Sequence, residues 1–307
     1  MRHDLLRNMA WRYVAGESVE DAIAVAQTLN SQGLRVTLDH LGESVTSATE
    51  AAAAADDYLH LLDEIAAAPA DANISLKLTQ LGLDVDPALA HFNLSRVLER
   101  ARLHGRRLKL PDDEIFVRID MESSAYTDRT LSLHAALWDA GARNVGVVLQ
   151  AALYRTGQDT ASALERGVRV RLCKGAYLEP APVAHPAKSS VDRAYAELAE
   201  QLLLHGRYPA FATHDERLIH HIQDIARRER ISPDRFELQM LFGIRRDLQL
   251  RLARQGYRVR VYVPYGRQWY PYLARRLAER PANVAFFLSA FARESLLSRS
   301  ARSAGAT

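Results

Sequence analysis

The sequence predicts an α/β fold of the (β/α)8 TIM-barrel type, distorted and with extra helices at both ends of the chain. Eight short runs rich in β-branched residues recur, and each is followed by an amphipathic helical stretch. These units fill about 250 residues, the usual length of such a barrel, without a Pro-, Gly- or Ser-rich linker. A doubly wound open sheet is the alternative, but no G-x-G-x-x-G motif follows the first run, which weakens it.

The predicted strands are short and are separated by helical segments rather than by tight turns, as parallel strands require. They cover residues 34–39, 73–78, 114–120, 144–150, 168–172, 209–214, 235–240 and 257–263.

Each predicted strand is followed by a predicted helix. These helices cover residues 47–68, 94–104, 128–140, 159–166, 190–205, 215–228, 244–255 and 269–279. The first is rich in alanine, but Tyr58, Leu61, Leu62 and Ile65 recur at helical spacing and indicate one buried face.

Both ends of the chain are expected to be helical, and residues 1–307 are expected to form a single domain. Residues 1–33 form a predicted N-terminal extension in which 2–31 are helical, with Ser18 as an N-cap and Asp21 three residues later. Residues 284–307 form a predicted C-terminal helix, 284–298, and a frayed tail.

The composition is that of an ordinary globular protein, with 40 basic and 37 acidic residues and a net charge of +3. No basic block with interleaved aromatic residues argues for a nucleic-acid partner. The single cysteine, Cys173, excludes an intrachain disulfide and fits a reducing compartment. Neither a bilayer-spanning apolar run nor a signal peptide is present. We expect a cytoplasmic protein that could still attach peripherally to the inner face of the cell membrane.

Polar or titratable residues stand near the ends of almost all the predicted strands. They are Asp39, Lys77, Asp120, Gln150, Arg171 with Lys174, Thr213 with His214, Gln239 and Tyr262. Any one of them could cap a turn or extend its charged end into solvent. Because the active sites of such barrels lie at the C-terminal ends of the strands, their recurrence predicts a polar site at the mouth of the barrel.

The charged candidates are mostly cationic, which suits a ligand that carries a carboxylate or a phosphate. The cations are Lys77, Arg171, Lys174, Arg275 and Arg276, and the carboxylates are Asp39, Asp120 and Glu43. No His, Cys or carboxylate cluster has metal-ligand spacing, and no G-x-S-x-G motif is present. A Schiff base on Lys77 or Lys174 stays open. The residues alone therefore predict an enzyme for an anionic ligand.

The segment RQWYPYLARRLAER, residues 267–280, allows two interpretations. Tyr272 lies three residues before Arg275 and four before Arg276, so on a helix one ring could cover both side chains. The pair is then either a solvent-facing helix surface or a clamp for an anion.

Eight motifs, in order, resemble those of the proline dehydrogenase family, and the resemblance runs from RYVAGE at Arg12 to Val284. They are LDHLGE (38–43), SLKLTQLG (75–82), RIDMES (118–123), VVLQA (147–151), RLCKGAY (171–177), FATHD (211–215), FELQMLFGI (236–244) and VYVPYGRQWYPYLARRLAERPANV (261–284). The combination of KGAY with YLxRR is specific, and the bacterial monofunctional members are the most similar.

The resemblance implies an FAD-dependent enzyme that oxidises L-proline to 1-pyrroline-5-carboxylate by hydride transfer from C5. It also implies a quinone as the electron acceptor and a functional link to 1-pyrroline-5-carboxylate dehydrogenase. Two other interpretations are a lyase or aldolase that uses a Schiff-base lysine, and a non-catalytic protein that binds carboxylates or nucleic acid.

The resemblance also implies a role for individual residues. The catalytic residues would be Asp120 and Arg171. The substrate-binding residues would be Lys77, Tyr177, Tyr262, Tyr272, Arg275 and Arg276. The FAD-binding residues would be Met121, Gln150, Arg171, Lys174, Gly175, Ala176, Thr213 and His214. Glu43 would close an ion pair with Arg275 over the bound substrate.

The sequence departs from the family pattern in three places. Asp215 stands in FATHD where some relatives carry Asn, and Cys173 replaces a branched aliphatic residue. The chain also begins close to RYVAGE, so the N-terminal helices of many relatives are expected to be absent.

Overall fold

The computed structural model describes residues 10–68, 70–108 and 115–278, and only the backbone of 274–278. The chain forms two compact units, Met1–Arg267 and Gln268–Thr307. The expected single domain stays a prediction.

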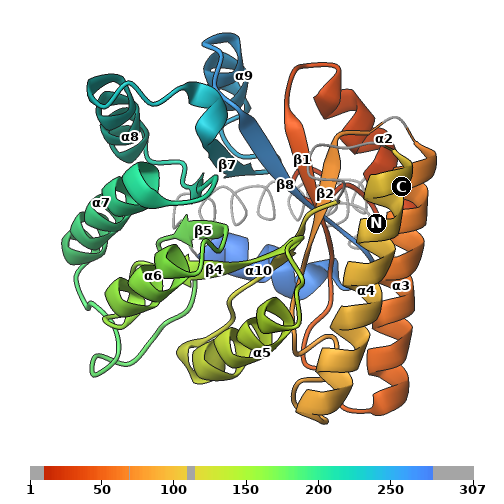
Figure 1. Cartoon of the computed structure of the whole chain (residues 1–307). Coiled ribbons are helices and arrows are strands. Elements are labelled where there is room, and N and C mark those ends of the chain that lie inside the picture. Colours follow the sequence, from red (N-terminus) through yellow and green to blue (C-terminus); the bar gives the residue numbers. More distant parts are fainter. Residues whose placement is uncertain (1–9, 69, 109–114, 279–307) are drawn as a thin grey trace, which may run out of the picture. The chain divides into compact units, whose positions relative to one another are not determined.

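The first unit is a closed barrel of eight parallel strands in the order of the sequence (Figure 1). The strands are β1 (Arg35–His40), β2 (Ala72–Leu76), β3 (Val117–Ile119), β4 (Val145–Gln150), β5 (Val170–Cys173), β6 (Ala210–Ala212), β7 (Glu237–Leu241) and β8 (Val259–Tyr265). Strand β8 pairs with β1 and closes the ring, with Val261 opposite Val36. The predicted (β/α)8 fold is confirmed.

Helices surround the strands (Figure 1). They are α2 (Val19–Asn30), α3 (Ala48–Ala67), α4 (Pro87–Arg107), α5 (Thr127–Asp139), α6 (Thr156–Glu165), α7 (Lys188–His205), α8 (Glu216–Arg228) and α9 (Arg246–Arg254), with short 3-10 turns η2 (Ser124–Tyr126) and η3 (Pro233–Arg235). No helix among the described residues has both the length and the apolar character that crossing a bilayer requires.

Alternate residues of each strand face the helices or the barrel interior. The apolar set, which includes Val36, Leu38, Ile74, Val117 and Val261, is fully buried in the main hydrophobic core. The residues between them along each strand are largely polar. The barrel interior is therefore filled mainly by polar side chains and not by apolar ones alone.

Local capping explains where several helices begin. Ser47 accepts a hydrogen bond from the N–H of Glu50 at the start of α3, and Asp215 accepts one from the N–H of Arg217 at the start of α8. Helix α4 begins seven residues before the predicted start at 94, because Asp86 caps it and Pro87 occupies its first turn.

The expectation of continuous helix over 2–31 is wrong in its middle part. Residues 11–18 form turns and bends, since Gly16 has a φ of 146° and Ser18 is extended. The predicted cap is confirmed, because Ser18 and Asp21 form a capping box at the start of α2. Residues 2–9 lie outside the described residues.

The second unit contains α10 (Trp269–Ala278), which agrees with the helix predicted from 269. The predicted C-terminal helix and tail over 284–307 lie outside the described residues.

Candidate active site

Asp120 is the centre of a hydrogen-bonded cluster inside the barrel. Its Oδ1 accepts from the hydroxyl of Ser75 at 2.6 Å and from Nη1 of Arg171 at 2.6 Å. Its Oδ2 accepts from the hydroxyl of Tyr262 at 2.8 Å. These side chains come from β2, the end of β3, β5 and β8, so the bonds cross the interior. Polar residues separated by up to 187 positions in the sequence therefore meet at one carboxylate.

Arg171 is buried and its guanidinium is bound on several sides. In addition to Asp120, its Nη1 donates to the hydroxyl of Ser75 at 3.1 Å, and its Nε donates to Oε1 of Gln239 at 2.5 Å. The guanidinium carbon lies 5.4 Å from the centre of the Tyr262 ring, within cation–π range. Burial raises the pKa of Tyr262 well above its usual value, with further increases from Asp120 and Asp39. Tyr262 therefore stays a neutral hydrogen-bond donor.

Asp39 and Lys77 form a second buried contact, which we call the mouth pair. The Lys77 ammonium lies 3.4 Å from each carboxylate oxygen of Asp39, and the Asp39 side chain is 1% exposed. Burial raises the pKa of Asp39 from 3.8 to about 6, because the attraction of Lys77 does not offset the lost hydration and Asp120 adds repulsion. Asp39 therefore titrates at a higher pH than an ordinary aspartate, near pH 6.

Lys77 itself is held in the charged form. Burial alone would lower the pKa of Lys77, but Asp39, Asp120, Glu122 and Glu43 outweigh it and raise the pKa above its ordinary value. A Schiff-base lysine must be a neutral amine to attack a carbonyl. The electrostatics of the mouth pair thus argue against Lys77 as a nucleophile. Because Glu43 is among the carboxylates that raise the pKa of Lys77, this residue of the loop after β1 lies within electrostatic range of the ammonium.

Glu237 and Arg260 form a third buried contact near the beginnings of β7 and β8, which we call the floor pair. Arg260 Nε donates to both carboxylate oxygens of Glu237 at 3.0 Å, and Nη1 donates to the backbone carbonyl of Val36 at 2.7 Å. Burial alone would raise the pKa of Glu237, but Arg260, Gln239 and Arg169 outweigh it and lower it to about 2. The floor pair is therefore fully ionised at neutral pH.

The loop after β5 and the end of β4 carry several of the residues expected to bind FAD. Gly175 is exposed with a φ of 114°, a conformation that favours glycine. A Cβ there would lie 3.3 Å from Oε1 of the buried Gln150. The amide nitrogen of Gln150 donates to the Glu122 carbonyl at 2.8 Å. Met121 is buried and Ala176 is exposed. The turn thus presents bare backbone beside a fixed amide.

Lys174 belongs to a charged cluster at the start of this loop. Its ammonium lies 2.5 Å from Asp192 and 3.1 Å from Asp215. Lys188 contacts Asp192 at 2.9 Å, and Arg217 contacts Asp215 at 3.1 Å. Hydrogen bonds from Arg217 are the main cause that holds the pKa of Asp215 below its usual value, and Lys174 adds to it. Three cations face two ionised carboxylates, which leaves one excess positive charge.

Thr213 and His214 follow β6 directly. The Thr213 hydroxyl accepts from the N–H of Asp215 at 3.1 Å, and Nε2 of His214 accepts from the N–H of Leu241 at 2.9 Å. Because Nε2 is the acceptor, the proton of a neutral His214 ring lies on Nδ1, which is then a donor.

This set of residues fits FAD. A glycine turn with bare backbone, a net positive cluster and neutral amide and imidazole groups provide the contacts that a pyrophosphate and a polar ring edge require. The fit rests on Gly175, Gln150, Lys174 and His214 in the arrangement just described.

The remaining predicted residues are placed only in part. Tyr177 is half-buried in the loop after β5, and Tyr272 lies in α10 of the second unit. Arg275 and Arg276 also belong to α10, and their side chains lie outside the described residues. The expected clamp and its ion pair with Glu43 remain predictions.

Some residues of the site differ from the expectation in position or were not expected at all. Gln239 and Tyr262 were expected at strand ends but lie inside β7 and β8. Ser75 joins Asp120 to Arg171, and its position two residues before Lys77 on the same strand face could have identified it. Asp192, which binds Lys174, gives no comparable signal, because it lies 18 residues later on α7 and not near a strand end.

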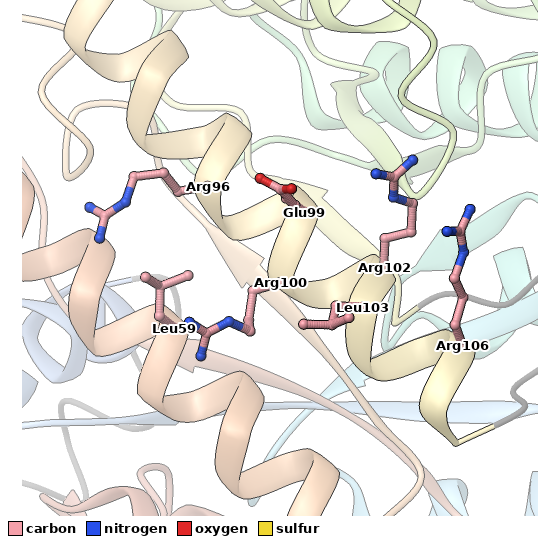
Figure 2. Close-up of a pocket in the computed structure, with 7 residues that line it drawn as sticks. All are labelled: Leu59, Arg96, Glu99, Arg100, Arg102, Leu103 and Arg106. Atoms are coloured by element: carbon pink, nitrogen blue, oxygen red, sulfur yellow. The ribbon is translucent and has the colours of Figure 1, made fainter.

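A groove of about 360 Å³ between α3 and α4 is distinct from this site (Figure 2). It is lined by Leu59, Arg96, Glu99, Arg100, Arg102, Leu103 and Arg106. It includes no strand-end residue, and Arg96 and Arg100 are already paired with Asp56 and Asp63 at 2.7 and 2.6 Å. Across the described part of the chain, no group of three or more His, Cys, Asp or Glu side chains is arranged to hold a metal ion.

Comparison with known proteins gives a family match over most of the chain. Residues 22–288 match the family model for proline dehydrogenase. A proline dehydrogenase from Deinococcus radiodurans is 44% identical over 283 residues, covering 91% of this chain and 88% of the relative. Proline dehydrogenase 2 from Bacillus subtilis is 41% identical over 280 residues, covering 91% and 89%.

A solved structure agrees in fold. The crystal structure of proline utilization A (PutA) from Bdellovibrio bacteriovorus, inactivated by N-propargylglycine, superposes with a TM-score of 0.79 at 26% identity. The match covers 88% of this chain but 32% of that protein, so this chain spans about a third of its length.

Proposed function

Because this chain belongs to the proline dehydrogenase family, and is therefore an oxidoreductase, we propose that it oxidises L-proline to 1-pyrroline-5-carboxylate with FAD as its cofactor. The observation that supports this reaction most directly is the partly buried cluster of Asp120, Ser75, Arg171 and Tyr262, which joins four strands of the barrel.

The substrate carboxylate is bound by cations. Lys77 is kept charged by the surrounding carboxylates, so it offers a permanent positive charge to an anion. Arg275 and Arg276 supply bidentate contacts, with Tyr272 packed beside them and Glu43 closing an ion pair with Arg275. A molecule as small as proline has few atoms to hold, so fixing its carboxylate sets the direction of C5.

The rest of the ring is oriented by polar and aromatic groups. Tyr177 and Tyr262 contact the faces of the ring. Tyr262 is held by its bond to Asp120, and Arg171 presents a fixed guanidinium to the reacting centre. Burial beside these cations favours the neutral proline amine, which must lose its proton before or during oxidation.

The cofactor is bound by residues that follow β3, β4, β5 and β6 or lie in them. They are Met121, Gln150, Arg171, Lys174, Gly175, Ala176, Thr213 and His214. The chemistry that FAD would supply at these residues is the acceptance of a hydride from C5 of proline. Lys174 and its net positive cluster neutralise phosphate charge, while Gln150 and the Nδ1–H of His214 orient polar atoms.

The electrons pass to a quinone, and the product is the substrate of 1-pyrroline-5-carboxylate dehydrogenase. The protein is cytoplasmic, as its single cysteine favours, with peripheral contact at the inner face of the cell membrane where a quinone is reached.

An anaerobic titration tests the proposal. The purified protein should be yellow, its flavin should be FAD, and the absorbance should bleach when L-proline is added and return when a soluble quinone follows. A colourless protein that FAD cannot reconstitute, or a flavin that L-proline does not bleach, would refute it. Borohydride trapping of a substrate on Lys77 or Lys174 would support a Schiff-base enzyme instead.

The clamp is tested by Arg276→Met. The KM for proline should rise by about 100-fold or more, because a charge-assisted bidentate contact is lost, while FAD stays bound. Arg228→Met, which removes an exposed arginine on α8, is the matched control and should leave the KM unchanged. Loss of flavin with an unchanged KM would show that Arg276 has a different role.

A further inference from the structure

Gln239 connects the two ends of the barrel interior. Its Oε1 accepts from Nε of Arg171 at 2.5 Å, and its Nε2 donates to Oε1 of Glu237. Glu237 in turn forms the floor pair with Arg260. An unbroken chain of hydrogen bonds therefore runs from the floor of the barrel to Asp120. Every member before Asp120 is buried, and the Asp120 side chain is 14% exposed.

The amide of Gln239 can adopt only one orientation in this chain. Arg171 Nε–H is a donor and can only face the amide oxygen, while an ionised Glu237 is an acceptor and can only face the amide nitrogen. The low pKa of Glu237 keeps it ionised at neutral pH. If the amide were flipped, its nitrogen would face the N–H of Arg171, donor against donor, and its oxygen would face the carboxylate of Glu237, acceptor against acceptor.

The far end of the chain is anchored to the backbone. Arg260 binds both oxygens of Glu237 and also donates to the carbonyl of Val36 on β1. Val36 is part of the register between β1 and β8 that closes the barrel. The position of Gln239 is thus set by the barrel rather than by a mobile loop.

A planar guanidinium is oriented fully only when bonds act on more than one of its nitrogens. Asp120 and Ser75 both bind Nη1 of Arg171, whereas Gln239 binds Nε. Without the bond from Nε, the remaining hydrogen bonds to Asp120 and Ser75 act on Nη1, and among the described contacts only the packing against the Tyr262 ring opposes rotation of the guanidinium about Nη1.

We propose that Gln239 and Glu237 are positioning residues that fix the guanidinium plane of Arg171 at the reacting centre. This inference rests on the proposed function, in which Arg171 acts beside C5 of proline. Gln239 acts through Arg171, so its loss should slow the chemical step and leave proline binding almost unchanged.

The test compares Gln239→Met with Gln249→Met. Both replace a buried glutamine by a side chain of similar length without hydrogen bonds; Gln249, on α9, donates only to the carbonyls of Leu241 and Ile244. Stopped-flow measurement of anaerobic flavin reduction by L-proline gives the rate constant and the dissociation constant of proline separately, and gel filtration reports whether FAD stays bound.

For Gln239→Met the reduction rate constant should fall about 10- to 100-fold, as for the loss of a charged hydrogen bond. The dissociation constant of proline should change less than about threefold, as expected for a group that acts on the chemical step alone. Gln249→Met should keep the rate of the unchanged protein. Equal rates in the two variants, or a loss in Gln239→Met explained by lost FAD, would overturn the proposal.

A compensating exchange provides a second test if Gln239→Met does not fold. Glu237→Gln alone allows the Gln239 amide to flip, whereas Glu237→Gln combined with Gln239→Glu restores a carboxylate acceptor for Arg171 and a matching amide toward Arg260. The double variant should reduce its flavin faster than Glu237→Gln. A double variant that is no faster would contradict the proposal.

These outcomes are separate from failure of the proposed function. If L-proline does not bleach the unchanged protein, the proposed function is wrong. If it does, and the variants behave alike, only the positioning role is wrong.

Discussion

The mouth pair and the floor pair place the same chemistry, a buried carboxylate beside a buried cation, in two regions of one barrel with opposite results. Burial raises the pKa of Asp39 to about 6, while Arg260 and its neighbours lower that of Glu237 to about 2. Both carboxylate side chains are almost completely buried. Burial alone therefore does not explain the difference.

Hydrogen bonding explains it. Glu237 accepts two bonds of 3.0 Å from Arg260, one from Gln239 and one of 3.3 Å from Tyr208. Asp39 has two long contacts of 3.4 Å with Lys77, and the hydrogen bond from Tyr262 lowers its pKa by less than the nearby carboxylate of Asp120 raises it. Charges repay their lost hydration only when their remaining lone pairs are bound. The floor pair is complete and structural, and the mouth pair is left incomplete where a substrate is proposed to bind.

The largest expected effect comes from breaking the floor pair. Arg260→Met should lower the free energy of unfolding by about 3–5 kcal/mol, because Glu237 would be left buried without its main partner. Urea unfolding at pH 7 measures this, with Arg228→Met as the exposed control, for which a loss below about 1 kcal/mol is expected. Similar losses in both variants would remove the distinction between the two regions.

The pH dependence of stability sharpens the comparison. In the folded state the pKa of Asp39 is about 6, against 3.8 ordinarily, so between these values the folded protein binds the proton and the unfolded chain does not. The unfolded chain then binds fewer protons at this site. The contribution of Asp39 to the free energy of unfolding therefore falls as the pH rises from about 4 to 6.

Asp39→Asn removes this dependence. The free energy of unfolding of the variant minus that of the unchanged protein should rise by on the order of 1–3 kcal/mol from pH 4 to pH 7. Urea titrations of both proteins in parallel measure the difference, because the contributions of other groups cancel. A flat difference would mean that Asp39 keeps its ordinary pKa.

The fold was predictable because its signal is local. Val36 and Leu38, or Val145 and Val147, recur at the two-residue spacing of a strand with one face in the core. The wrong prediction of helix over residues 11–18 also has a local cause. The pattern of polar and apolar residues is compatible with a helix there, but the positive φ of Gly16 interrupts it. Caps such as Asp86 shift a helix start without changing the order of the elements.

The site was predictable only as a set of residues. Expected positions near strand ends grouped Asp120, Arg171 and Tyr262, and the structure brings the three side chains together, although Tyr262 lies inside β8. Which atoms meet was not predictable, since the link from Gln239 to Arg171 depends on strand register and tilt across the interior. The opposite pKa shifts of Asp39 and Glu237 follow from such distances and leave no trace in the sequence.

The smallest expected effect is the most discriminating. Lys77→Met should cost about 1 kcal/mol or less at pH 5, because Asp39, whose pKa is already raised, can keep its proton and avoid an unpaired buried charge. The loss in the free energy of unfolding should grow as the pH rises above 6. There Asp39 of the variant either ionises without a cation beside it or stays protonated at a pH where the unfolded chain does not. Urea unfolding at pH 5 and pH 8 measures both values, with Arg260→Met as the reference, whose cost should be large at both because Glu237 is ionised throughout. A loss for Lys77→Met at pH 5 as large as that for Arg260→Met would show that the mouth pair is as tightly ionised as the floor pair, and the proposed contrast between an incomplete mouth and a complete floor would not hold.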